Sequence, residues 1–163
     1  MQHARRLVES WLPRLLGSGD PGPVLPIDES VTEYWPRLNT DLHGWIDWSW
    51  SLRDIEAFCH AFSFPHSGAK TTIRGATARL KSVDVVLGRT YHPFQRGLVF
   101  RIGQDGGIWI AHPEGVLLVR EFELDDSSMA VRLGDRFFTP VAHLENALSR
   151  RVQYLPSGKV VAN

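Results

Sequence analysis

The residues able to carry chemistry are seven histidines, one cysteine and a glycine-rich stretch. Histidine binds metals or transfers protons, but these follow no recognisable metal-binding motif, and His92 and His112 each precede proline, which favours turns. No Gly-x-Ser-x-Gly motif of hydrolases occurs, and residues 103–107 lack the lysine and helix of a phosphate-binding loop. Cys59 lies in a predicted helix and is expected to be a buried apolar residue. We therefore predict no catalytic residue and no metal site.

The overall charge gives no attraction to nucleic acid or membrane. Eighteen basic residues balance eighteen acidic ones, and no apolar stretch approaches the length of a membrane-spanning helix. The N-terminal residues lack the apolar core of a signal peptide. We expect a cytoplasmic protein with no membrane contact.

Charge is nevertheless unevenly distributed. Residues 70–101 contain seven basic residues and one acidic residue, a net charge of +6, whereas residues 105–126 have a net charge of −5. Alternation along two predicted strands favours a solvent-facing cationic ribbon that would bind the backbone of a nucleic-acid substrate. The candidate binding residues are Lys70, Arg74, Arg79, Lys81 and Arg89. The alternative is an outer face whose charge is balanced by the neighbouring acidic strands.

Periodicity predicts a helix, a linker and a mainly β domain. Leu7, Trp11 and Leu15 lie on one stripe of a predicted helix over residues 4–16, and the proline-rich residues 18–30 predict a linker. Ser51 is a predicted N-cap, with Asp54 in the capping-box position of a helix that ends near Pro65. We expect residues 1–30 to form the helix and linker and residues 31–163 to form the domain.

Between residues 69 and 124 the pattern changes to a period of two, with recurrent glycine turns. Strands are predicted at residues 69–74, 77–87, 97–102, 107–112 and 115–124, with a β-bulge near Ser82 where the apolar alternation changes face. Residues 136–140 could add an edge strand, and Thr139 could cap a last helix over 140–150. The expected fold is α+β and mainly β, an OB-like Greek-key barrel of five to six antiparallel strands with a helix at its entry.

Four of the six tryptophans lie within residues 32–51. They would either stack on bases or pin an extended segment against the barrel, and their position outside the strands favours the second reading.

Residues 32–90, with the stretches TEYWPRLNTDLHGWIDWSW and FPHSGA, resemble the C-terminal domain of the folate-dependent formyltransferases, typified by methionyl-tRNA formyltransferase. The matching residues, in order, are Thr32, Tyr34, Pro36, Arg37, Asp41, Gly44, Ile46, Asp47, Trp48, Ser49, Pro65, Gly68 and Ala69. Ser67 departs from the family pattern, which has proline there.

The resemblance implies an OB-like barrel and a separate catalytic partner domain. In that family, formyl transfer from 10-formyltetrahydrofolate takes place on an N-terminal Rossmann-like domain, whose motifs this sequence does not show. The chain is therefore expected to bind no cofactor and to transfer no formyl group alone. The interdomain and structural residues that the resemblance implies are Leu7, Trp11, Leu15, Tyr34, Trp35, Ile46, Asp47 and Trp48.

The expected function is non-catalytic positioning of the acceptor substrate, which could be tRNA or a small amine such as an amino sugar. A second hypothesis is an independent OB-type nucleic-acid-binding module that stacks bases on Phe100, Trp109 and Phe122. A third is a dimerising module that exchanges its first helix between copies.

Overall fold

The computed structural model describes residues 9, 12–13, 16–17, 29–31, 33 and 37–155. The chain divides into two compact units, Met1–Trp35 and Pro36–Asn163. In the first unit, Glu9, Leu12, Pro13, Leu16 and Gly17 are helical, and Glu29–Val31 form a short 3-10 helix, η1. Five residues given an interdomain role lie outside the described residues: Leu7, Trp11, Leu15, Tyr34 and Trp35.

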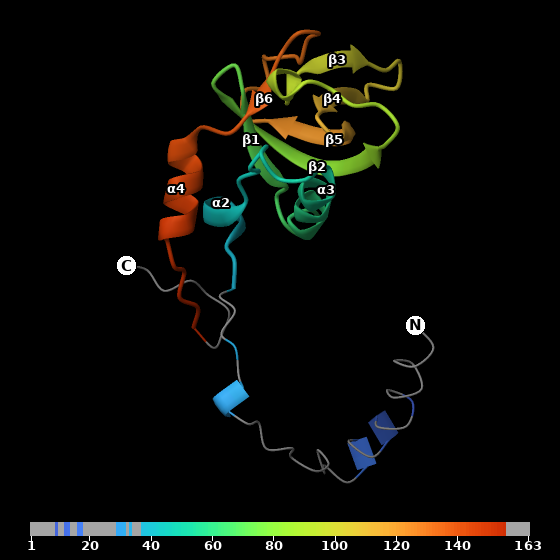
Figure 1. Ribbon diagram of the computed structural model, residues 1–163. Coiled ribbons are helices and arrows are strands. Elements are labelled where there is room, and N and C mark those ends of the chain that lie inside the picture. The colour runs from blue at the N-terminus through green and yellow to red at the C-terminus, as the bar shows by residue number, and fades with distance from the viewer. Residues whose placement is uncertain are drawn as a thin grey trace. The chain divides into compact units, whose positions relative to one another are not determined.

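The second unit is built on one antiparallel sheet that curls into a small barrel (Figure 1). Its strands are β1 (Ala69–Ile73), β2 (Ala76–Val86), β3 (Val99–Ile102), β4 (Ile108–His112), β5 (Gly115–Leu124) and β6 (Phe137–Phe138). They pair in the order β3-β4-β5-β2-β1-β6. The predicted mainly β, small-barrel fold is confirmed.

The predicted bulge in β2 is also confirmed. The register between β2 and β5 shifts on both sides of Ser82, while Leu80 pairs with Phe122 and Val83 pairs with Val119. Leu80 and Val83 are both buried although they are three residues apart, because the bulge turns the strand's inward face by one residue. One long strand can thus bend round the barrel.

Backbone hydrogen bonds between the start of edge strand β3 and the start of edge strand β6, with the residues just before each, close the sheet on itself. Phe137 N donates to Gly97 O at 2.8 Å, Val99 N donates to Asp135 O at 2.8 Å, and Gly134 N donates to Val99 O at 2.9 Å. Gly97 has φ +78°, and a Cβ there would lie 2.0 Å from the carbonyl oxygen of Phe137. Only glycine fits at position 97. We call residues 97–99 and 134–137 the closing seam.

Two helices, α2 and α3, come before the first strand of the barrel in the sequence. In α2 (Thr40–His43), the Asn39 side chain accepts a hydrogen bond from Leu42 N. In α3 (Leu52–Ala61), the Ser51 hydroxyl accepts a hydrogen bond from Asp54 N, as the sequence predicts. The carboxylate of Glu114, in the β4–β5 turn, accepts from Leu52 N and so ties the start of α3 to the sheet.

Helix α3 packs against the part of β2 that is not paired with β1 (Figure 1). Glu56 accepts a hydrogen bond from Val85 N, and His60 Nε2 lies 3.1 Å from Val83 O. Side chains of α3 therefore satisfy backbone groups that a neighbouring strand would otherwise satisfy. The apolar face of α3 completes a single core whose buried members include Ile46, Leu52, Ile55, Cys59, Ile73, Leu80, Val83, Val99, Ile110, Leu117 and Phe137.

The last helix, α4 (Val141–Ser149), agrees with the predicted range, but its predicted cap is wrong. Pro140 occupies the N-cap position, and no side chain caps the helix. The Thr139 hydroxyl instead lies 3.4 Å from the Thr71 hydroxyl in the barrel wall. Helix α4 lies beside α2, and none of its residues is buried (Figure 1).

Candidate functional site

Residues 44–50, the part of the tryptophan-rich segment that holds Trp45, Trp48 and Trp50, are pinned against the barrel, as the sequence analysis favours. Ile46 N donates to Lys70 O at 2.8 Å, so that residues 44–46 run alongside β1. Ile46 and Trp48 are buried, and Asp47 accepts a hydrogen bond from Ser49 N. Trp45 stacks on His143 of α4 with ring centroids 4.2 Å apart, and Trp50 meets Phe58 edge-on at 4.9 Å. The interdomain role of Ile46, Asp47 and Trp48 stays a prediction.

The expectation that Lys70 faces solvent is wrong. Lys70 is only 6% exposed. Its Nζ donates a hydrogen bond to the carbonyl oxygen of Asp41 and lies 4.3 Å from the centre of the Trp45 ring. Burial lowers the pKa of Lys70, and the nearby Arg79 lowers it further, while Asp41 and Asp125 raise it. Strand alternation predicted an open face there, but residues 44–46 cover it.

The other cations of the predicted ribbon pair with acidic residues. Arg74 Nε lies 3.3 Å from Asp135, Arg79 Nε lies 3.3 Å from Asp125, and Lys81 forms an ion pair with Glu123. Each of these contacts joins the β1–β2 hairpin to β5 or to the segment that follows it. The two charge poles of the sequence are therefore neighbours in space. Whether Arg74, Arg79 and Lys81 bind substrate stays a prediction.

Arg89 lies apart from them, in an aromatic–arginine surface formed by Arg89, Tyr91, Phe100, Arg101 and Trp109. The Arg89 guanidinium lies 5.2 Å from the Tyr91 ring centre and 6.0 Å from that of Phe100. Tyr91 and Phe100 are 5.2 Å apart, and the Arg101 guanidinium lies 4.7 Å above the Trp109 ring. Because Arg101 pairs with Trp109 across β3 and β4, the sheet register holds this second pair together.

This surface borders a hollow of about 370 Å³. Phe100 and Trp109 are half-buried, and both line the hollow. Within the described part of the chain, neither Arg89 nor Arg101 forms an ion pair. Planar rings beside unpaired guanidinium groups are suited to stacking on a base and contacting a phosphate. Phe122, the third predicted stacking residue, packs against the core and lies outside this surface.

The two buried groups with reactive side chains have structural contacts. Burial raises the pKa of Cys59 to about 12, which keeps its thiol protonated. His112 Nε2 lies 3.1 Å from Trp50 O, while its Nδ1 accepts a hydrogen bond from Glu114 N. Both ring nitrogens of this neutral imidazole are thus used in holding the start of α3.

Among residues 37–155 and the few described before them, no three His, Cys, Asp or Glu side chains are grouped to hold a metal ion. In the same part of the chain, no helix has the length and apolar character needed to span a membrane.

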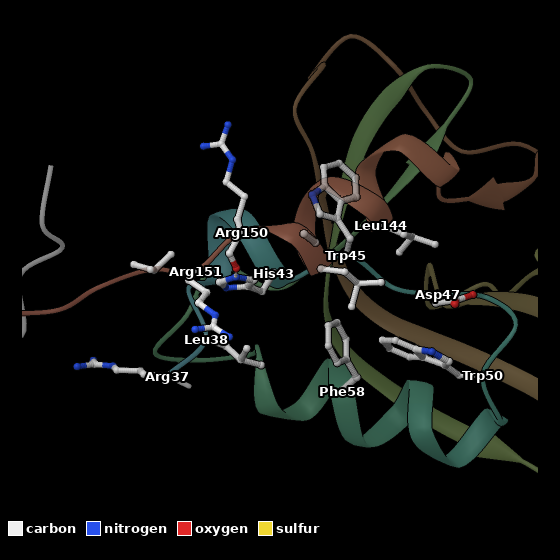
Figure 2. Close-up of a pocket in the computed structure, with 13 residues that line it drawn as sticks. Arg37, Leu38, His43, Trp45, Asp47, Trp50, Phe58, Leu144, Arg150 and Arg151 are labelled. Carbon is white, nitrogen blue, oxygen red and sulfur yellow. Dashed lines mark hydrogen bonds between the residues drawn. The ribbon is translucent and has the colours of Figure 1, made fainter. Parts of the chain in front are cut away.

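A second hollow, the α4 groove, has a volume of about 440 Å³ (Figure 2). Its apolar lining comes from three places in the sequence: Leu38, Trp45 and Trp50 before α3, Phe58 within α3, and Leu144 and Leu148 in α4. Arg37, Arg150, Arg151 and Asp47 also line it.

Of these surfaces, the sequence analysis identified only part. Arg89, Phe100 and Trp109 were candidates, whereas Tyr91 and Arg101 were not. The spacing of Arg101 and Trp109 around the turn at 103–107 carried the signal for one pair. The α4 groove joins segments about a hundred residues apart, so no local pattern could reveal it.

Comparison with known families gives one match. The sequence model described as "Formyl transferase, C-terminal domain" matches residues 40–132, which include α2, α3 and strands β1 to β5. A search of curated proteins finds no match to this chain. The family match covers more than half of the sequence and agrees with both the barrel and the motif around Trp48. The chain belongs to the formyltransferase C-terminal domain family.

Proposed function

We propose that this chain positions the acceptor substrate of a formyltransferase of the methionyl-tRNA type. In this proposal the chain has no catalytic residue of its own, and formyl transfer takes place on a separate folate-binding catalytic domain. The 10-formyltetrahydrofolate cofactor would bind to that domain and supply the formyl group. The residues of this chain would bind and orient the RNA.

The aromatic–arginine surface is the observation that supports an RNA acceptor. Single-stranded RNA is bound by stacking its bases on aromatic rings and by contacts between arginine and phosphate. Phe100 and Trp109 are half-buried rings that lie beneath Arg89 and Arg101, two cations that no described carboxylate neutralises. Arg74, Arg79 and Lys81, by contrast, would have to leave an acidic partner to contact a phosphate.

A filter-binding titration of the full chain with a transcribed initiator tRNA, repeated over a series of salt concentrations, tests this proposal. Removing one stacking ring with Trp109→Ala should weaken binding about 5- to 100-fold. Reversing one phosphate contact with Arg101→Glu should weaken binding and lower the slope of log K against log salt by about one or more. Arg53→Glu, on an exposed position of α3, is the matched control and should change neither value.

A tRNA affinity that stays the same from low to high salt, or that Trp109→Ala leaves unchanged, would contradict tRNA as the acceptor.

The pairing of Arg74, Arg79 and Lys81 with acidic residues favours a second candidate, a small amine acceptor such as an amino sugar. For that acceptor, a nucleotide-linked amino sugar should bind with little salt dependence, and tRNA should not compete with it.

The independent OB-type module differs from both candidates in needing no catalytic partner. Phe100, Trp109 and Phe122 are all half-buried, but Phe122 packs against the core and lies outside the aromatic–arginine surface. Adding the chain to a folate-dependent catalytic domain and measuring formyl transfer distinguishes the two classes. Stimulation supports the accessory role, and RNA binding without stimulation supports the independent module.

A further inference from the structure

The α4 groove has apolar walls that no described residue fills. In α4, Leu148 is 88% exposed, and Leu38 on the other side is 52% exposed. The rings of Trp45, Trp50 and Phe58 line the same hollow. Its volume of about 440 Å³ falls within the range of about 300–1,000 Å³ that is typical of small-molecule sites.

The charged groups of the groove are mostly positive and lie away from the rings. In Figure 2 the side chains of Arg37, Arg150 and Arg151 lie at one end, and the rings of Trp50 and Phe58 lie at the other. None of the three arginines forms an ion pair within the described part of the chain. The fourth charged residue, Asp47, lies at the end of the rings.

We propose that the α4 groove binds a small aromatic carboxylate. The ring of the ligand would pack against the Trp50 and Phe58 rings, which contact each other edge-on, and its carboxylate would accept hydrogen bonds from Arg150 and Arg151. Arginine suits this role because its planar guanidinium pairs with both oxygens of a carboxylate. Repulsion from Asp47 disfavours the reversed orientation, which would place the carboxylate beside the rings.

The positive charge of the groove also argues against residues 4–16 of the same chain as its occupant. Residues 4–16 contain three arginines and one glutamate, so their sign matches that of the arginines at the groove. The proposal goes beyond the acceptor-positioning function and does not depend on it, because the groove and the aromatic–arginine surface share no residue.

The test is a nitrogen–proton NMR titration of the full chain with three probes that share a naphthalene ring system and differ in charge. They are 2-naphthoate, 2-naphthylmethanol and 2-naphthylmethylamine. The indole resonances of Trp45 and Trp50 should shift and saturate with 2-naphthoate. Those of Trp48, which is buried, and Trp109, on the other surface, should stay in place. The neutral alcohol should bind about tenfold more weakly than the carboxylate, and the cationic amine more weakly still.

A double charge reversal, Arg150→Glu with Arg151→Glu, tests the anion contact directly. Both side chains are exposed, and the unchanged Trp48 indole resonance would report that the variant remains folded. Its affinity for 2-naphthoate should fall at least tenfold, whereas Arg53→Glu should leave the affinity unchanged.

Three results would overturn the proposal. They are equal affinity for the three probes, unchanged affinity in the double variant, and shifts confined to Trp109. Shifts of Trp45 and Trp50 that depend on protein concentration without any probe would also overturn it, since they would identify a second copy of the chain as the occupant.

Discussion

The indole Nε1 of Trp48 donates a 2.8 Å hydrogen bond to the hydroxyl of Thr71, inside the barrel wall. Thr71 is wholly buried, and its hydroxyl in turn donates to Phe138 O at 3.1 Å. The Trp48 ring also contacts the Phe137 ring, with centroids 6.3 Å apart. This bond therefore ties the tryptophan-rich segment to both β1 and β6.

Thr71→Val should destabilise the domain by about 1–3 kcal/mol, because it leaves the buried Trp48 N–H without an acceptor. The carbonyl of Phe138 keeps a donor in the variant, since Thr72 also bonds to it at 2.6 Å. Urea unfolding of Thr71→Val, Trp48→Phe and the double variant measures the coupling. The double variant should lose less than the sum of the two single losses, and strict additivity would contradict the assigned bond.

Gly97→Ala should destabilise the barrel by about 2 kcal/mol or more, because its Cβ would collide with the Phe137 carbonyl as well as strain the backbone. Gly75→Ala is the matched control. Gly75 also has a positive φ, of +84°, but a Cβ there would meet nothing within 4 Å. Its cost should be limited to conformational strain of about 1–2 kcal/mol. Thermal or urea unfolding with equal losses at the two positions would argue against the tight closing seam.

Stability should fall as the pH drops below about 6.5, in part through His112. Burial lowers the pKa of His112, Glu114 and the carbonyl of Trp50 partly oppose this, and Arg96 lowers it further. Between its lowered folded pKa and the ordinary value near 6.5, the unfolded chain binds more protons than the folded one. The stabilisation from neutral His112 is thus complete above that value and declines below it.

His112→Gln should flatten this decline between pH 6.5 and 5 when urea midpoints are compared across pH. The exposed His66 provides the control variant, His66→Gln, which should keep the wild-type slope. An unchanged slope in His112→Gln would show that other groups produce the acid sensitivity.

Lys70→Met should act on stability and leave RNA binding unaltered. The variant keeps the apolar stem but loses the bond to Asp41 O and the contact with the Trp45 ring, at an expected cost of about 1–2 kcal/mol. Because Lys70 is buried, the salt slope of tRNA binding should match that of the wild type. A lower slope with unchanged stability would restore the predicted binding role of Lys70.

Much of the fold could be predicted because local patterns encode it. Alternation gave the long strands, the change of face at Ser82 gave the bulge, and Ser51 with Asp54 gave the start of α3. Helix α2 was not predicted, since its four residues lie within the tryptophan-rich segment and carry no period of their own. Lys70 was misplaced because alternation within a strand does not reveal which segments will cover each face.

The candidate sites were less predictable, for the same physical reason. Arg89 and Trp109 could be named as candidates from residue type, but their partners Tyr91 and Arg101 become neighbours only through the folding of β3 and β4. The α4 groove exists because α4 lies beside α2, and no sequence pattern in either helix predicts that packing.

The closing seam consists almost entirely of main-chain atoms. Its hydrogen bonds do not depend on side-chain type, except that Gly97 and Gly134 have positive φ angles, and its Val99 and Phe137 side chains are constrained by the core rather than by the closure itself. The family match ends at residue 132, so it includes residues 97–99 of the seam and stops before residues 134–137. A closure held by main-chain bonds can therefore be kept while the sequence of its second half, residues 134–137, drifts away from the family pattern.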